Sequence, residues 1–240
     1  MAVFDGQDMR DYLERVSRQP LVRAIRDQGV ELLKVTPGER VLDAGCGPGD
    51  MAARFADLGA SVTAMDHDPA MVGVAGDIPG ITAVTADLAT LDRPGEFDVI
   101  WSERVLQHVH DPDQIVGNLV RALAPGGRIC LVDVDWTGLV VDGVDDDLTD
   151  QVLGVFRTVV ANPSMGRTLR RRLVRHGVVK TEVKAFLGVS TELADAAAVI
   201  PVLDERVIPG PAAWFSALRA ADEKGEFLTA LPVYLVLGSA

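Results

Sequence analysis

The sequence predicts an α/β fold with a doubly wound, mostly parallel sheet that carries helices on both faces. Short apolar runs alternate with helical stretches from Arg40 onward, and seven such runs can be counted. The first run leads directly into the glycine-rich stretch DAGCGPGD. Apolar strands that alternate with helices are typical of parallel sheets covered on both faces. The length of 240 residues suits one such domain, so we expect a single compact unit over residues 1–240.

Two helices are expected before the first strand. Apolar residues recur at helical spacing from Leu13 to Leu33, Pro20 interrupts them, and TPGER at 36–40 ends them. Residues 1–38 are therefore expected to form an N-terminal helical cap.

The seven strand candidates differ in how they are connected. In chain order they read RVLDA, SVTAMD, ITAVTAD, FDVIWS, GRICLVDVDW, TEVKAFLG and LPVYLVLG. Short, regular connections join the first five, so residues 39–135 are expected to form the ligand-binding core. The chain then becomes acidic and irregular, which favours a lid or substrate-recognition insertion at 136–178. Residues 179–240 supply the C-terminal strands and helices.

The composition excludes several kinds of partner. A net charge of −12 opposes binding to a phosphate backbone, because nucleic-acid affinity depends on many Lys and Arg side chains. No apolar run is long enough for a membrane span, and the stretch MAVFDGQDMR does not resemble a signal peptide. We therefore expect a cytoplasmic protein, a monomer or a homodimer, that binds neither nucleic acid nor membrane. Cys46 and Cys130 are expected to be buried free thiols, and the histidines lack the spacing of a metal site.

The glycine-rich turn is the strongest functional signal in the chain. Gly45, Gly47 and Gly49 occupy alternate positions directly after the first strand candidate. Ligands of open parallel sheets lie at the carboxyl ends of the strands, so these glycines allow a ligand to approach the backbone closely. Close packing of the turn is the alternative interpretation. The dinucleotide fingerprint G-x-G-x-x-G would require a glycine at Asp50, and no GK[ST] follows to bind phosphate.

The turn DAGCGPG resembles the first motif of the class I S-adenosylmethionine-dependent methyltransferases, D/E-x-G-x-G-x-G. Four further segments resemble that family in the same order along the chain. Asp66 ends the second strand candidate, where the family has the acidic residue that binds the ribose. TADLATL places Asp87 at the adenine amino group and Leu88 beside the ring. FDVIWSERVLQHV resembles the F-D-x-V segment with its following loop and short helix containing L-x-H-V, and LAPGGRICLVDV resembles the L-x-P-G-G turn.

The resemblance implies a Rossmann-like, seven-stranded fold in which the last strand, LPVYLVLGSA, lies antiparallel beside the fifth. It also implies S-adenosylmethionine as the cofactor and S-adenosylhomocysteine as the product. NPSMGRTLRRRLVRHGVVKTEVKA is similar to a segment of the quinone-biosynthesis subgroup and of other small-molecule methyltransferases. The cofactor-binding residues implied by the resemblance to the family are Asp43, Gly45, Cys46, Gly47, Gly49, Asp66, His67, Asp87, Leu88, Ser102 and Glu103. Helix capping is the alternative role for Asp66 and for Asp87.

The acceptor is expected to be an O, N or C nucleophile of a small molecule, such as a secondary metabolite of natural product biosynthesis or a quinol. The loop SERV lacks the D/N-P-P-Y/F sequence of amino-methylating nucleic-acid enzymes, and the chain has no Pro-Cys nucleophile. Trp101 is a further candidate for the pocket wall, whereas Trp214 is expected in the core. The candidate substrate-binding residues are Tyr12, Arg104, His108 and Trp136.

His108 is the candidate catalytic base, because an ordinary imidazole pKa near 6.5 suits proton acceptance at neutral pH. A purely structural role is the alternative. Two other functions stay open: a methyltransferase-like protein that uses bound S-adenosylmethionine structurally, as a cyclase, decarboxylase or binding partner, and, less favoured, a NAD(P)-dependent oxidoreductase. The N-terminal helices and the segments 136–166 and 200–213 are expected to close over the acceptor.

Overall fold

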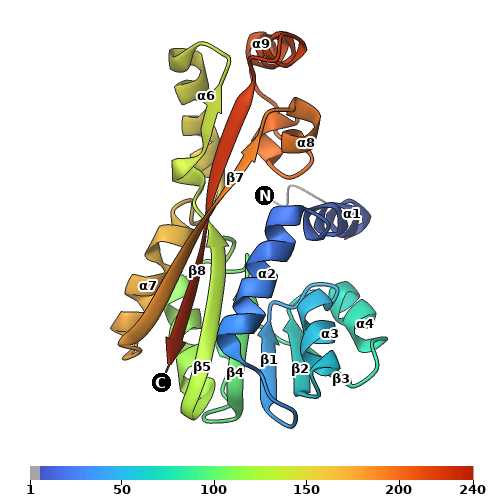
Figure 1. Ribbon diagram of the computed structural model, residues 1–240, viewed down its shortest axis with the longest axis vertical. Coiled ribbons are helices and arrows are strands. Elements are labelled where there is room, and N and C mark those ends of the chain that lie inside the picture. Colours follow the sequence, from blue (N-terminus) through green and yellow to red (C-terminus); the bar gives the residue numbers. More distant parts are fainter. Residues whose placement is uncertain (1–5, 240) are drawn as a thin grey trace.

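The computed structural model describes residues 6–239 and has a central sheet of eight strands (Figure 1). Their order across the sheet is β3-β2-β1-β4-β5-β8-β6, and β7 pairs along β8. The first five strands pair in parallel, and β8 runs antiparallel to β5, β6 and β7. The predicted fold class, with its antiparallel last strand, is therefore confirmed. The strands are β1 Arg40–Ala44, β2 Ser61–Asp66, β3 Ile81–Thr85, β4 Phe97–Glu103, β5 Leu123–Val134, β6 Val140–Asp142, β7 Lys180–Ser190 and β8 Leu228–Ser239.

The sheet has one strand more than the seven predicted. The additional strand is β6, which lies in the segment 136–178 that was expected to be an insertion. Its three residues pair with Leu228–Ala230, at the start of the long strand β8, whereas β5 pairs with β8 only from Val233 onward. Because β8 begins before its pairing with β5 starts, the backbone groups along that edge of its first residues are available for another strand. β6 pairs with them.

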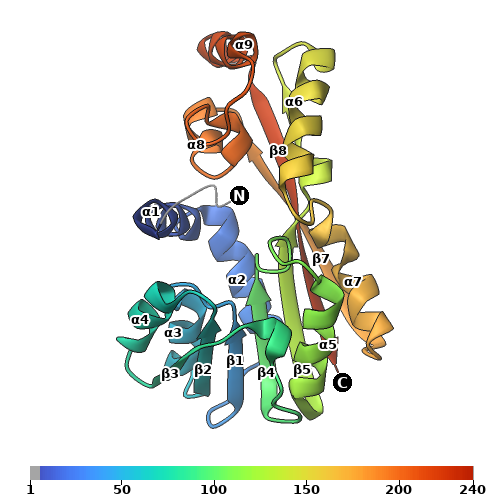
Figure 2. The ribbon, with the colours of Figure 1, turned by 180° about the vertical axis from the view of Figure 1, so that it is seen from behind.

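Helices cover both faces of the sheet. α2 and α3 pack on one face, and α5 and α7 pack on the other, which Figure 2 shows from behind. The α-helices are α1 Gly6–Ser17, α2 Pro20–Leu33, α3 Asp50–Asp57, α4 Pro69–Gly76, α5 Pro112–Ala122, α6 Asp146–Val159, α7 Met165–Arg175, α8 Leu193–Ala197 and α9 Ala212–Glu223. The short 3₁₀ helices are η1 Leu88–Thr90, η2 Trp136–Gly138 and η3 Pro201–Leu203.

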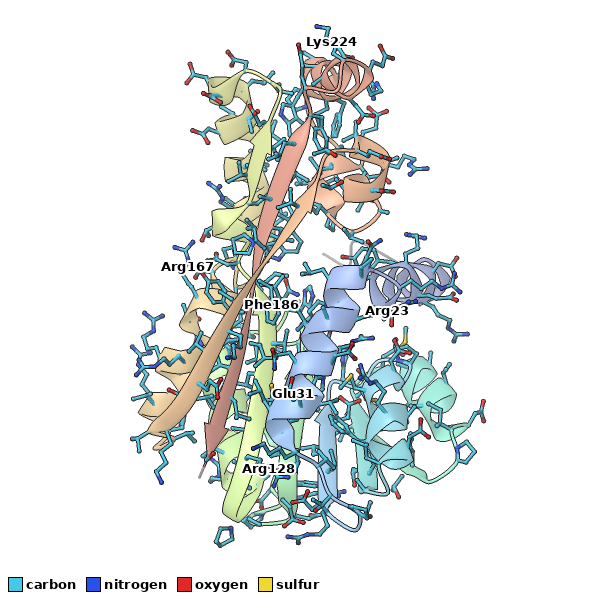
Figure 3. The ribbon with its side chains drawn as sticks, in the orientation of Figure 1. Arg23, Glu31, Arg128, Arg167, Phe186 and Lys224 are labelled. Carbon is cyan, nitrogen blue, oxygen red and sulfur yellow. The ribbon has the colours of Figure 1, made fainter. Side chains whose placement is uncertain are left out.

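The two predicted N-terminal helices are present, and α2 is part of the core. Pro20 begins α2, where its missing N–H removes no helical hydrogen bond. Gly29 lies against Trp101: a Cβ at this position would lie 2.3 Å from Cζ3 of the indole. At the end of α2, Arg128 from β5 donates to the Leu33 carbonyl and to both carboxylate oxygens of Glu39 (Figure 3). These contacts fix α2 across the sheet.

The long strands β7 and β8 carry α6, α8 and α9 at the end of the molecule opposite the C-terminus (Figure 1). Trp214 is fully buried there, as expected, and its indole N–H donates to the Thr149 hydroxyl at 3.2 Å. Trp136 packs edge-on against Phe156, with the ring centroids 5.3 Å apart. The segment 136–178 therefore contributes η2, β6 and α6 to this packing, whereas its last helix, α7, packs with α5 on the sheet.

Both cysteines carry buried free thiols, and burial raises the pKa of each. Among residues 6–239, no helix combines the length and apolar composition that a bilayer crossing requires. Within the same part of the chain, no three His, Cys, Asp or Glu side chains are grouped so that they could bind a metal ion.

Candidate functional site

The glycine turn between β1 and α3 has a packed side and an open side. Gly45, Gly47 and Gly49 all have positive φ angles, of 78°, 52° and 94°. A Cβ on Gly45 would lie 2.2 Å from Val105 Cγ2, so this glycine is required by packing. A Cβ on Gly47 would meet only Leu13 Cδ1, at 3.8 Å. Packing therefore explains Gly45 but not Gly47, whose half-buried backbone lines a pocket.

This pocket lies at the carboxyl ends of β1 and β4, beneath the N-terminal helices. Six of the predicted site residues line it, namely Asp43, Gly45, Cys46, Gly47, Glu103 and Arg104. The other lining residues are Leu13, Arg26, Pro48, Asp50, Met51 and Trp101. Trp101 is thus a pocket residue as expected, although its side chain is fully buried in the core.

Asp43 brings an unsatisfied carboxylate oxygen to the pocket. The side chain is 2% exposed, and the backbone N–H of Ala52 donates to it. Its Oδ2 atom is buried without a hydrogen-bond partner. Burial, reinforced by the negative charge of Glu103, raises the pKa of Asp43 to about 7, although the Arg26 charge opposes this change. A cationic group in the pocket would therefore find an acceptor for its protons and would favour the ionised carboxylate.

Asp66 joins the glycine turn to the end of β2. Its Oδ2 accepts from the Gly47 N–H at 2.9 Å, and its Oδ1 accepts from the Asp68 N–H at 3.0 Å. His67 Nδ1 lies 3.2 Å from Oδ1. The cap of α4 is Asp68, which accepts from the Ala70 N–H, so capping does not explain Asp66.

Asp87 does cap a helix. Its Oδ1 accepts from the Ala89 N–H at 2.8 Å at the start of η1. Leu88 is buried beside it, and its carbonyl accepts from Asn118. These two residues lie after β3, and neither lines the pocket among the described residues.

The end of β4 is held by an ion pair that the sequence did not reveal. Ser102 donates to the Ala44 carbonyl at 2.8 Å, which ties β4 to β1. Arg26 from α2 donates to Glu103 at 2.8 Å and also reaches Asp50 Oδ2 at 3.3 Å. Arg26 shares the helical stripe of Gly29 and Leu33, which are buried. An arginine on an apolar stripe was the available signal that its side chain points inward.

Arg104 follows Glu103 in the left-handed conformation, with φ of 56°, and its N–H donates to the Val132 carbonyl at 2.8 Å. Tyr12 from α1 lies beside its guanidinium and donates from its hydroxyl to the Val199 carbonyl at 3.1 Å. Burial raises the pKa of Tyr12, and Arg104 counteracts this effect. Tyr12 and Arg104 are thus brought together where the N-terminal helix meets the segment after α8.

His108 lies in turns, not in the short helix that the resemblance implied. The Gln107 N–H donates to the Asp133 carboxylate at 3.1 Å, so it is not available for a helical hydrogen bond to the backbone. His108 is exposed to solvent, and desolvation by the neighbouring protein, together with the Arg104 charge, lowers the pKa of its imidazole to about 4. Trp136 donates to Gln107 Oε1 at 2.6 Å and is 7% exposed, so its ring is packed in the interior.

Comparisons with known proteins concern the domain and the fold. Residues 42–131 match the family model described as a methyltransferase domain. The fold is similar to that of a crystal structure of a putative methyltransferase from Bacillus halodurans, with a TM-score of 0.65, 16% identity, and coverage of 89% of this chain and 97% of that one. It is also similar to YcgJ from Bacillus subtilis, with a TM-score of 0.67, 15% identity, and coverage of 90% and 98%.

The match thus places a methyltransferase domain over the stretch from β1 to β5. The curated relatives of the chain include an uncharacterised 37.1 kDa protein in a transposon of Streptomyces fradiae, 28% identical over 97% of this chain and 72% of that protein. A ubiquinone biosynthesis O-methyltransferase of Pseudomonas aeruginosa is 34% identical over 41% of this chain. The aligned part spans 45% of the length of that relative.

S-adenosylmethionine is the cofactor that the first motif predicts, and the match to a methyltransferase domain supports this prediction. The pocket suits the methionine end of this cofactor. The open backbone at Gly47 leaves room for a ligand against the turn, and the unpaired oxygen of Asp43 suits an ammonium group. A carboxylate could be bound by Arg26 or Arg104, the two arginines that line the pocket.

Proposed function

We propose that this methyltransferase transfers the methyl group of S-adenosylmethionine to an O, N or C nucleophile of a small molecule. The observation that supports this proposal is the open backbone of Gly47 beside the unpaired, buried Asp43 oxygen. That arrangement is costly without a ligand, because a buried polar atom normally has a hydrogen-bond partner. In this proposal the protein works in the cytoplasm, as a monomer or a homodimer.

The cofactor is assigned to the carboxyl ends of β1, β2 and β3. The methionine end lies on the turn from Gly45 to Gly49, with its ammonium on Asp43. Asp66 accepts from the ribose hydroxyls: each of its oxygens already accepts backbone N–H groups, but a carboxylate has about four acceptor sites in all. Adenine is assigned to the neighbourhood of Asp87 and Leu88. The capping bond of Asp87 uses its Oδ1 and is compatible with this role.

The bound cofactor supplies a methyl group on a sulfonium centre, which a nucleophile attacks in line. The chain's contribution is to orient the acceptor, to exclude water and to accept a proton where the nucleophile carries one. Tyr12, Arg104, His108 and Trp136 are the residues assigned to the acceptor side. Arg104 lines the pocket and Tyr12 interacts with Arg104, whereas Trp136 is buried and would act by supporting Gln107. The N-terminal helices and residues 136–166 and 200–213 would close over the acceptor.

A small acceptor is supported by the net charge of −12, which disfavours nucleic acid. The curated relatives that act in ubiquinone biosynthesis are O-methyltransferases, which supports a quinol-like acceptor or another hydroxyl compound, including one from natural product biosynthesis. Solved structures with this fold also include a geranyl diphosphate C-methyltransferase from Streptomyces coelicolor, 16% identical with a TM-score of 0.54, so the acceptor atom stays part of the proposal.

The test is to incubate the purified protein with labelled S-adenosylmethionine and a panel of phenols, amines and quinols. We expect one class of acceptor to gain the mass of one methyl group, with S-adenosylhomocysteine formed in equal amount. A substrate that rearranges without gaining mass, while the cofactor stays intact, would instead establish a structural use of the cofactor. That alternative has a parallel in the [4+2]-cyclase SpnF, which shares the fold at 19% identity and a TM-score of 0.53.

A further inference from the structure

Arg104 is an inward-facing cation whose charge is poorly matched by its neighbours. Its side chain lines the pocket and is only 18% exposed. Its Nε atom is buried without a hydrogen-bond partner, and the Glu103 Oε1 atom is 4.0 Å from it. Glu103 is bound instead by Arg26, at 2.8 Å. The Glu103 carboxylate thus lies near two arginines, but it is hydrogen-bonded to Arg26 and not to Arg104 Nε.

The other acid near Arg104 does not supply the missing negative charge. Asp133 is fully buried at the end of β5, and its carboxylate accepts from the N–H groups of Gln107 and Val134. Burial raises the pKa of Asp133 to about 7, even though the Arg104 charge lowers it. A carboxyl group whose pKa is raised by burial is a weaker counterion than an exposed carboxylate. The acids near Arg104 therefore balance its positive charge only in part, in a protein whose net charge is −12.

Arg104 has a backbone conformation that residues other than glycine rarely adopt. Its φ of 56° lies in the left-handed region, which crowds the Cβ atom. The hydrogen bond from its N–H to the Val132 carbonyl fixes the peptide in this orientation. Lys34, the other such residue among those described, ends a helix, where this conformation is common. Arg104 ends no helix, and strained residues of this kind gather at functional sites.

The neighbours of Arg104 place it on the acceptor side of the pocket. Tyr12 and His108 both lie near enough to interact with its charge. Tyr12 also bonds to Val199, just after α8, in the part of the chain that the proposed function assigns to closure. Arg26 is the arginine nearer the glycine turn, because it reaches Asp50 at the start of α3. Arg26 is therefore the better placed of the two for the methionine carboxylate of the cofactor.

We propose that the methyl acceptor carries a carboxylate and that Arg104 binds it. The planar guanidinium offers donors in a fork that matches the two oxygens of a carboxylate. The nucleophile to be methylated would lie elsewhere on the same small molecule, and the acid group would fix its orientation. This inference rests on the proposed function, since it names the charge class of its substrate. The methionine carboxylate is the other possible source of the same chemistry, and the experiment separates the two.

The test measures binding by calorimetry at pH 7.5 to the protein loaded with S-adenosylhomocysteine. The probes are benzoate, phenylacetate and hexanoate, each compared with its primary amide. We expect at least one acid to bind about tenfold or more tightly than its amide. Arg104→Asn should abolish this preference, and asparagine tolerates the left-handed conformation better than most residues, which protects the fold. Arg104→Lys should keep part of the preference, because it retains the charge but loses the fork.

Arg23→Met is the matched control. Arg23 carries the same charge on the exposed surface of α2 (Figure 3), and its replacement should leave the acid preference unchanged. The affinity of Arg104→Asn for S-adenosylhomocysteine itself should stay within about threefold of the wild type. That binding also reports that the variant is folded.

Three results would overturn the inference. The first is that no acid binds more tightly than its amide to the wild type, including the case in which none binds. The second is an acid preference that survives in Arg104→Asn. The third is a large loss of S-adenosylhomocysteine affinity in that variant, which would assign Arg104 to the cofactor carboxylate. The two proposals can also fail separately. If the preference for acids depends on Arg104 but none of the phenols, amines and quinols tested for the proposed function is methylated, the carboxylate site stands and the proposed function fails.

Discussion

Replacing Asp43 by asparagine should stabilise the protein without cofactor and at the same time weaken cofactor binding. Burial raises the pKa of Asp43 from 3.8 to about 7 in the folded protein. The unfolded chain therefore loses this proton as the pH passes 3.8, whereas the folded protein keeps it until about pH 7. Folding stability consequently decreases between these two values, and the full cost is present above pH 7. The difference corresponds to at most about 4 kcal/mol.

Asparagine removes the charge and keeps an oxygen for the Ala52 N–H, but its amide group is then buried beside the pocket. We therefore expect a net gain of about 1–3 kcal/mol at pH 7.5, or at least about 2 °C in the melting temperature of a chain of this length. The loss of a charge-assisted hydrogen bond to the cofactor ammonium should weaken S-adenosylhomocysteine binding about 10- to 100-fold. Thermal unfolding without ligand and calorimetry with ligand measure the two effects.

The pH dependence provides the sharper measurement. Wild-type affinity for S-adenosylhomocysteine should rise with pH from 5.5 to about 7 and then level off, because only the ionised carboxylate pairs with an ammonium. The affinity of Asp43→Asn should be flat over this range. Asp98→Asn is the control: Arg40 lowers the pKa of Asp98 to about 2, so its loss should destabilise the protein and leave cofactor affinity unchanged. An Asp43→Asn variant with wild-type affinity and the same pH profile would refute the assignment.

Four further outcomes are expected. Gly47→Val places a side chain in the pocket at a φ of 52° and should lower S-adenosylhomocysteine affinity at least tenfold in calorimetry. Asp66→Ala should cost about 1–3 kcal/mol of binding, and unchanged affinity in a folded variant would contradict its role. His108→Ala should lower turnover by about 10²- to 10⁴-fold at similar cofactor affinity, whereas turnover within a few-fold of wild type at every pH would make His108 structural. Arg128 lowers the pKa of Glu39 from 4.5 to about 2, so the stability from this pair is fully present above pH 4.5 and is lost as the pH falls towards 2. Glu39→Gln should therefore unfold about 1–2 kcal/mol more easily at pH 7 and show a smaller acid effect in denaturant titrations, and equal acid sensitivity would argue against it.

The features that sequence alone predicted are those that depend on short stretches of chain. The alternation of apolar runs located the five parallel strands, and the spacing of the glycines located the turn before α3. Helical periodicity and Pro20 located α1 and α2. Each of these signals arises from residues close in sequence, whose conformational preferences do not depend on the rest of the fold. The antiparallel position of β8 came from the resemblance to a family.

The features that sequence did not predict depend on contacts between distant segments. Arg26 binds a residue 77 positions away, so only the folded chain shows that it lines the pocket. Trp136 was expected at the end of the fifth strand, which suggested contact with a ligand, but it begins η2, and Gln107 and Phe156 enclose it. The turns around His108 form because a buried carboxylate from β5 takes the N–H that a helix would have used. In each case a partner far along the chain decides the outcome.

The contact between Gly29 and Trp101 bears on where such a chain can be shortened or fused. The indole of Trp101 is fully buried, and its cover on one side is the bare backbone of α2 at Gly29. A chain that began at β1 would expose this ring to water and remove the helix end that Arg128 binds. The segment that matches the family, residues 42–131, also lacks β8, which pairs with β5 over seven residues. Gene fusions and recombination should therefore preserve α1 and α2 before the matched segment and the antiparallel pair of β7 and β8 after it as one inherited block.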